Sequence, residues 1–189
     1  WLLHSGAFYE VEKTLTPGVE LPRPLHWFKW QAYTTWISGA LLLIIVYYAG
    51  GRAALADPTV ADRSHWDAIG IGIGAIVSGT IIYESVNRAM APRSPKSAAA
   101  IWITALVGFS VMLTQMMSGR AAFIHVGAML GTIMAFNVSE TIVPSQRELV
   151  TSVAEGRGSA KELSDRAKRV SIHNNYFTFP VIVLMLSSH

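Results

Sequence analysis

The stretch GRAAFIHVGAMLGTIMAFN, residues Gly119 to Asn137, decides the fold class. Arg120 and His125 are the only residues in it that can carry a charge. A helix of about 20 predominantly apolar residues is long enough to cross the hydrocarbon core of a membrane. The cation and the imidazole near its start mark either the level at which a helix meets the lipid headgroups or a working site.

Composition places the whole chain in the same class. Of its 189 residues, 51% are hydrophobic and only 14% are charged, and the mean hydropathy is +0.37. Soluble domains carry about 25% charged residues, so a membrane protein is predicted. The net charge of +3 arises in short stretches between apolar runs, which favours orientation in a bilayer over binding to nucleic acid. The absence of cysteine excludes thiolate metal ligands and attached haem c within this chain, and no metal site is predicted.

Five apolar runs are long enough to be considered as membrane spans, and a spanning chain must satisfy its own backbone hydrogen bonds. We therefore predict an all-α, polytopic transmembrane helix bundle with about five spanning helices. The predicted spans are residues 31–48, 67–86, 98–117, 121–143 and 174–188.

Small residues recur at every fourth position in two of these runs. Gly70, Gly74 and Ser78 lie in the second run, and Gly127, Gly131 and Ala135 lie in the fourth. Small-residue seams of this kind let helices approach closely in lipid. The second and fourth helices are predicted to pack tightly along these seams.

Lysine and arginine are unevenly divided between the segments that connect the spans. The segment before the first span and the second and fourth connections hold twelve of the fifteen, and the remaining three are Arg52, Arg63 and Arg120. The excess of positive charge predicts that the long connections are cytoplasmic. Residues 144–172 are predicted to be a cytoplasmic connection that includes a short surface helix over residues 160–170.

Two motifs place polar and aromatic side chains on the cytoplasmic side of the predicted spans. HWFKWQAYTTW, from His26 to Trp36, is either an aromatic belt with a snorkelling lysine or a cluster that faces a ligand. HNNYFTFP, from His173 to Pro180, supplies an imidazole, two amides and a phenol where the last span begins. Helix capping by asparagine explains part of that set, and a binding site explains it as well.

Four strings carry a resemblance to a known family: LHSGAFYEVEK, LPRPLHWFKWQAYTTWISG, GRAAFIHVGAMLGTIMAFNV and HNNYFTFPVIVLMLSSH. They resemble, in the same order, the membrane domain of the bacterial cytochrome-c-linked urate oxidases, also called urate hydroxylases. One departure is Ser139 and Glu140, where the family is expected to have apolar residues.

The resemblance implies an eight-helix domain in the bacterial inner membrane, followed by a C-terminal domain that holds haem c. Residues 1–189 are then a single transmembrane domain and an interior portion that covers the second to sixth helices. The implied reaction is oxidation of urate to 5-hydroxyisourate, with electrons passed to cytochrome c.

Urate is a planar anionic purine, so a site for it needs stacking faces, groups that pair with the ring edges and a cation. The resemblance therefore implies substrate binding by the residues at the cytoplasmic mouth, with a histidine as catalytic base. The predicted bases are His26 and His173, and the predicted substrate ligands are Trp27, Lys29, Trp30, Asn174, Asn175 and Tyr176.

Electrons must then cross to the other side of the membrane, for which a haem b in the membrane domain is an expected carrier. Its axial ligands would be His125 and His189, with Arg120 as partner of a propionate. A hydrogen bond between helices explains His125 equally well.

Two other classes of function stay open. The chain is alternatively a membrane anchor for an electron-transfer domain, or an accessory subunit of a larger respiratory or photosynthetic complex. A transporter is a weaker alternative. Whether the protein assembles as an oligomer is not indicated by the sequence.

Overall fold

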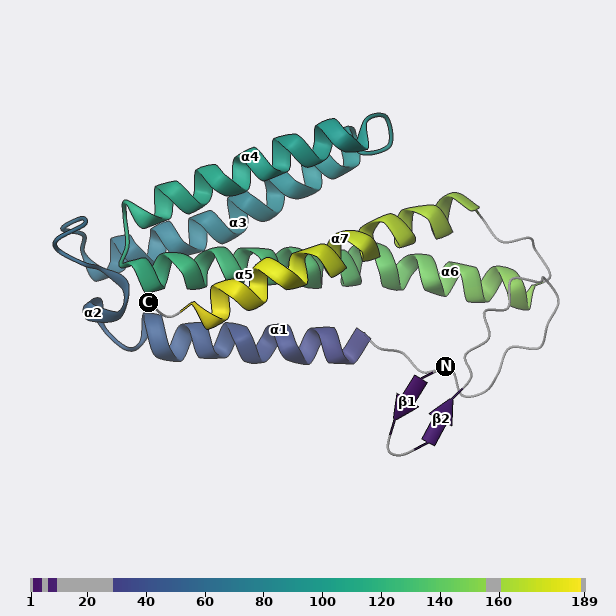
Figure 1. Cartoon of the computed structure of the whole chain (residues 1–189), viewed down its shortest axis with the longest axis horizontal. Coiled ribbons are helices and arrows are strands. Elements are labelled where there is room, and N and C mark those ends of the chain that lie inside the picture. The colour runs from purple at the N-terminus through teal and green to yellow at the C-terminus, as the bar shows by residue number, and fades with distance from the viewer. Residues whose placement is uncertain (1, 5–6, 10–28, 156–160, 188–189) are drawn as a thin grey trace.

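The computed structural model describes residues 2–4, 7–9, 29–155 and 161–187. In these ranges long helices form an elongated bundle (Figure 1). The predicted all-α bundle is confirmed. One addition, which the sequence did not indicate, is a short antiparallel hairpin of β1 (Leu2–His4) and β2 (Ala7–Tyr9).

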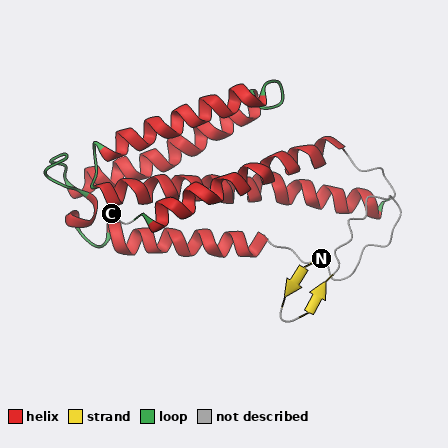
Figure 2. Cartoon of the chain, viewed as in Figure 1, coloured by secondary structure: helices red, strands yellow, loops and turns green. Residues whose placement is uncertain are grey.

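The long helices run back and forth along the bundle, so consecutive connections lie at opposite ends (Figure 2). Two π-helical turns, η1 and η2, continue α1 and α5 without a break. The helical elements are α1 (Lys29–Leu43), η1 (Ile44–Tyr48), α2 (Arg52–Leu55), α3 (His65–Ala89), α4 (Pro95–Thr114), α5 (Gly119–Asn137), η2 (Val138–Ile142), α6 (Val143–Ala154) and α7 (Lys161–Leu186).

Capping residues fix where three of the helices begin. The Ser64 hydroxyl accepts a hydrogen bond from the Asp67 backbone N–H at the start of α3, at 3.1 Å. The Ser118 hydroxyl accepts one from Ala121 at the start of α5, at 3.3 Å. Pro95 begins α4, a position where its missing N–H removes no helical bond. These starts set the register in which the helices meet.

Helix α5 is the centre of the bundle, because it packs against α1, α3, α4 and α7. Met129, Leu130 and Ile133 on α5 are fully buried. Two polar residues on the same helix, His125 and Asn137, are equally buried. Polar groups at such positions need hydrogen-bond partners within the protein.

The outer surface of the bundle is apolar, as expected of helices that face lipid. Among the described residues, four helical stretches are long and apolar enough to cross a membrane: Lys29–Tyr48, His65–Ala89, Pro95–Thr114 and Gly119–Ser152. Large exposed hydrophobic residues occur on each, for example Leu42, Ile81, Ile103 and Phe123. Three of the five predicted spans lie wholly within these stretches, and the span predicted over residues 98–117 ends three residues beyond Pro95–Thr114.

The fifth predicted span forms the second half of α7. Helix α7 begins at Lys161, so residues predicted to form a separate surface helix are instead its first turns. No glycine or proline occurs between Lys161 and Phe179 to end the helix. Together with α6, these turns make most of the described part of residues 144–172 helical, and α6 packs against α7.

The prediction that the second and fourth spans pack together is confirmed, but the predicted small-residue seams do not make the contact. On α5, Gly131 has no atom within 4 Å of an added Cβ, and Gly127 meets only Leu184 of α7. Gly70 and Gly74 have no atom within 4 Å of an added Cβ. A Cβ at Gly72 would instead overlap the Nε2 atom of His125, and one at Gly79 would overlap the sulfur of Met129. The contact face therefore follows the helical period through Ala68, Gly72, Ala75, Gly79 and Tyr83.

The described arginine and lysine residues fall into two sets, one at each end of the bundle. Arg52, Arg63 and Arg120 lie at the end that carries α2, which we call the α2 end (Figure 1). The connection that contains Arg93 and the helix that contains Arg147 lie at the opposite end, the α6 end. The predicted orientation in the membrane depends on this division of positive charge between the two ends.

Candidate functional site

Two groups of buried polar residues meet α5, one near its start and one at its end. The His125 cluster consists of Tyr48, Gly72, Ala121 and His125, and the Asn137 network consists of Tyr83, Asn137, His173 and Asn174. Twelve residues separate His125 from Asn137, about 18 Å along a helix that rises 1.5 Å per residue. Each group adjoins a π-helical turn: Tyr48 ends η1, and η2 begins directly after Asn137.

In the His125 cluster both ring nitrogens have partners. The Nδ1 atom lies 2.7 Å from the Ala121 carbonyl oxygen, and because a carbonyl only accepts, Nδ1 carries the proton. The Nε2 atom of the neutral ring then accepts a hydrogen bond from the Tyr48 hydroxyl at 3.1 Å. The side chain is fully buried, and Gly72 on α3 lies against its ring. The hydrogen-bonding groups of the imidazole are therefore all paired within the protein, without any ligand.

This geometry does not fit an axial haem ligand. A haem iron must face the Nε2 lone pair, but that lone pair faces the Tyr48 hydroxyl, and the α3 backbone at Gly72 lies in contact with Nε2. Arg120 is exposed at the start of α5, and His189 lies outside the described residues. The haem b on Arg120, His125 and His189 stays a prediction.

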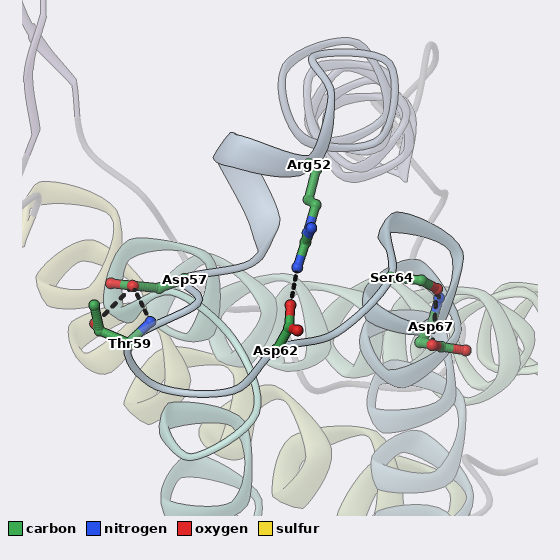
Figure 3. A network of polar contacts seen from close by, with 6 residues as sticks. All are labelled: Arg52, Asp57, Thr59, Asp62, Ser64 and Asp67. Carbon is green, nitrogen blue, oxygen red and sulfur yellow. Dashed lines mark hydrogen bonds and ion pairs between the residues drawn. The ribbon is translucent and has the colours of Figure 1, made fainter.

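The segment at the α2 end between Arg52 and Asp67 is held by local polar contacts (Figure 3). Arg52 pairs with Asp62, and Ser64 donates to the Asp67 carboxylate at 2.7 Å. Asp57 accepts hydrogen bonds from the Thr59 hydroxyl at 2.7 Å and from the Thr59 backbone N–H at 2.9 Å. These two bonds hold the pKa of Asp57 below its ordinary value. The contacts are those of a well-formed loop.

The Asn137 network joins three helices. Asn137 on α5 donates one amide hydrogen to the Tyr83 hydroxyl on α3, at 3.1 Å, and the other to the Asn174 side-chain oxygen on α7, at 2.9 Å. The Asn174 amide donates to the Met134 carbonyl at 3.1 Å. The Tyr83 hydroxyl lies 2.9 Å from Nδ1 of His173. Asn137 is thus the centre of the network.

Aromatic rings surround Tyr83 within this network. Its ring centroid lies 5.2 Å from that of Trp102 on α4 and 5.6 Å from that of Phe177 on α7. Both rings meet Tyr83 edge to face, a favoured arrangement of aromatic pairs. Tyr83 and Trp102 are buried. The network therefore lies next to apolar ring surfaces contributed by three helices, α3, α4 and α7.

Three polar atoms around this network are buried and have no hydrogen-bond partner. They are Oδ1 of Asn137, Nε1 of Trp102 and Nε of Arg169, which precedes His173 by one turn of α7. Each such atom costs about 1 to 3 kcal/mol when no partner replaces water. One acceptor and two donors near aromatic faces are what a bound polar ring would satisfy.

The structure brings together only some of the residues predicted to form the site. His173 and Asn174 lie in the network, whereas Asn175 and Tyr176 are exposed, Tyr176 by 69%. Lys29 lies over the ring of Trp30, with Nζ 5.2 Å from the centroid, and Trp30 is 64% exposed. That pair fits the aromatic belt better than a ligand site. His26 and Trp27 lie outside the described residues.

Four residues of the site were not predicted from the sequence: Tyr83, Asn137, Trp102 and Arg169. Asn137 had a usable signal, because an amide at the end of an apolar run needs a partner inside the membrane. Tyr83 and Trp102 had none, since aromatic residues near helix ends are usually interfacial. No group of three or more histidine, aspartate or glutamate side chains in the described part of the chain is placed to hold a metal ion.

Fold and site together define the class of protein: a helical bundle whose apolar helices enclose an incompletely paired polar network. The chain belongs to the urate oxidase N-terminal family, whose model matches residues 1–189. The family membership confirms the resemblance noted in the sequence and connects the chain with urate. Comparisons with curated proteins and with solved structures found no match.

Proposed function

We propose that this chain is the membrane part of a urate-oxidising enzyme and that the Asn137 network holds the urate. The observation that carries the proposal is the set of unpaired buried atoms on Asn137, Trp102 and Arg169. In the alternative function as an anchor, no substrate would compensate the cost of leaving these atoms unpaired, and only ordered water would pair with them.

Urate matches the chemistry of these groups. Its edges alternate ring N–H donors with carbonyl acceptors, and it is an anion at neutral pH. Oδ1 of Asn137 would accept from a ring N–H, and Nε1 of Trp102 would donate to a carbonyl. The guanidinium of Arg169 would balance the charge, a role that the sequence had suggested for Lys29. The rings of Trp102 and Phe177 offer apolar faces beside these groups.

The proposed reaction adds the oxygen of water to the urate anion and gives neutral 5-hydroxyisourate, one proton and two electrons. The electrons pass to a cytochrome c, in keeping with the family resemblance, and a haem c in that partner supplies one-electron acceptance. The residues of the network bind and orient urate and receive a proton. His173 is the predicted base that lies in the network.

We further propose that the bundle spans the bacterial inner membrane with the α6 end in the cytoplasm. The supporting observations are the four apolar helices and the excess of lysine and arginine in the segments at the α6 end. The Asn137 network lies toward that end, so urate would enter from the cytoplasm.

The test compares two indole substitutions in the whole protein. Trp102→Phe keeps an aromatic ring but removes the unpaired N–H, whereas the control Trp36→Phe removes an N–H that is already bonded to the Thr132 hydroxyl at 3.1 Å. We expect Trp102→Phe to weaken urate binding about 5- to 150-fold, the equivalent of about 1 to 3 kcal/mol. Trp36→Phe should leave the Kd within about twofold, which is below about 0.5 kcal/mol.

A second variant tests the proposed acceptor atom, Oδ1 of Asn137. Asn137→Leu removes the Oδ1 atom, and Thr132→Val is its control on the same helix, since Thr132 bonds to the Ala128 carbonyl outside the network. Equilibrium dialysis with labelled urate measures both, and thermal unfolding checks that each variant is folded. Unchanged urate binding in both Trp102→Phe and Asn137→Leu would contradict the proposed site and favour the anchor.

A further inference from the structure

We infer that Tyr83 and His173 act as a proton relay in which Tyr83, rather than His173, is the group that meets the reacting water. The inference rests on the proposed function, because it concerns the same site. It assigns a catalytic role to Tyr83, a buried residue of α3 that lies 90 positions from its partner in the sequence.

The direction of the hydrogen bonds supports this assignment. Asn137 uses its amide N–H to reach the Tyr83 hydroxyl, so the hydroxyl oxygen accepts at that position. The single proton of Tyr83 is then free to point at Nδ1 of His173, 2.9 Å away. Nδ1 must accept, which places the ring proton of neutral His173 on Nε2. Asn137 therefore sets the polarity of the whole chain of bonds.

The relay transfers one proton in two coupled movements. An O–H bond of the attacking water breaks as its proton moves to the Tyr83 oxygen, which has a second lone pair for it. The Tyr83 O–H bond breaks as its own proton moves to Nδ1 of His173. Tyr83 ends neutral, His173 ends as imidazolium, and the water oxygen bonds to urate as two electrons leave for the cytochrome c acceptor. Charge and atoms balance.

His173 is suited to pass the proton on. No described residue forms a hydrogen bond with its Nε2 atom, so that N–H is free to release its proton. Arg169 lies one turn earlier on the same helix, and its positive charge disfavours a long-lived imidazolium. His125 lacks this freedom, because its other nitrogen is bonded to the Ala121 carbonyl.

The experiment compares Tyr83→Phe with Tyr48→Phe in the whole protein. Both remove a hydroxyl that donates to a histidine, but Tyr48 lies in the His125 cluster. We expect Tyr83→Phe to lower kcat for urate-dependent cytochrome c reduction about 100-fold, while the urate Kd changes less than about threefold, below about 0.7 kcal/mol. Tyr48→Phe should keep kcat within about threefold, which is small beside the effect of losing an acid–base group.

A second readout separates proton transfer from a structural role. His173→Ala should lower kcat to a similar extent, and added imidazole should restore part of it, because a diffusible base replaces the lost proton acceptor. This arm also serves if Tyr83→Phe does not fold. A kcat of Tyr83→Phe close to wild type, or no rescue of a folded His173→Ala protein, overturns the relay.

Failure of the relay and failure of the urate site give different results. If Trp102→Phe and Asn137→Leu weaken urate binding but Tyr83→Phe turns over normally, the site stands and the relay is wrong. If neither Trp102→Phe nor Asn137→Leu changes urate binding, the site itself lies elsewhere and the relay falls with it.

Discussion

The bundle contains two partly buried tyrosine–histidine pairs, Tyr48–His125 and Tyr83–His173, at different depths along its central helix. In the first pair both imidazole nitrogens have partners within the protein. Around the second pair, Asn137, Trp102 and Arg169 each keep a buried atom without a partner, whereas beside the first pair one such atom is found among the described residues, Nδ1 of His65, whose Nε2 bonds to the Tyr48 carbonyl. The same residue types thus form one complete cluster and one incomplete network.

This difference separates a structural group from a binding site. A complete cluster gains its full stabilisation on folding and needs nothing from outside. An incomplete network costs free energy until a ligand or ordered water pairs with it. A histidine in an apolar helix therefore does not by itself indicate a binding site. Buried polar atoms without hydrogen-bond partners around it do.

The largest expected effect follows from disrupting the complete cluster through Gly72. In Gly72→Ala the new methyl group overlaps Nε2 of His125, so the ring must move and lose its bond to Tyr48. We expect a loss of about 2 to 4 kcal/mol in the free energy of unfolding, measured by unfolding in detergent. Gly74→Ala is the control, because no atom lies within 4 Å of its added Cβ, and it should be neutral or slightly stabilising.

The variant His125→Gln tests whether the His125 cluster takes part in function. Glutamine keeps one hydrogen bond, so the expected loss of stability is about 1 to 2 kcal/mol, while urate-dependent reduction of cytochrome c continues. Thermal unfolding and cytochrome reduction are measured on the same preparation. Loss of electron transfer in a folded His125→Gln protein would restore the interpretation of His125 as a haem ligand.

The two adjacent asparagines of α7, Asn174 and Asn175, differ in their contacts. Asn174 bonds to Asn137 and to the Met134 carbonyl, whereas Asn175 is exposed. We expect Asn174→Leu to weaken urate binding about tenfold, the equivalent of one lost hydrogen bond. Asn175→Leu should change binding less than about twofold. A larger effect at Asn175 than at Asn174 would place urate on the other face of α7.

The smallest expected effect lies in the loop at the α2 end. Thr59→Val removes the hydroxyl that bonds to the Asp57 carboxylate, so the pKa of Asp57 should rise toward its ordinary value. A carbon-13 NMR titration of labelled aspartate measures it. Since a lowered pKa stabilises the fold above the unfolded-state value and this contribution is lost as the pH falls through the folded-state value, the variant should be less stable than wild type above the ordinary pKa of aspartate, should match it in strong acid, and should oxidise urate normally. An unchanged Asp57 pKa would contradict this loop geometry.

Hydropathy alone was enough to predict the helices, because every predicted span needs a continuous apolar run. It could not predict that α7 is continuous, because amphipathic turns at the start of a helix read like a surface segment. A four-residue spacing also indicated the wrong face of α3, since the true contact through Gly72 and Gly79 follows a period of 3.6.

Only part of the candidate site could be predicted from the sequence, because the rest depends on how the helices pack. His173 and Asn174 were visible as a local motif, but which of two neighbouring asparagines faces inward depends on the rotation of α7 in the bundle. Tyr83 and Asn137 lie 54 residues apart and meet only through tertiary packing. Local patterns do not determine such contacts, so the network became visible only in three dimensions.

The most direct test of the account observes the indole N–H groups of Trp102 and Trp36 while urate is added. The Trp102 Nε1 atom is buried and unpaired, whereas the Trp36 Nε1 atom already donates to Thr132. With nitrogen-15 tryptophan in the whole protein, assigned by Trp102→Phe and Trp36→Phe, we predict a saturable shift of the Trp102 resonance and none for Trp36. A Trp102 resonance that stays unchanged at saturating urate would contradict the claim that the Asn137 network holds the substrate.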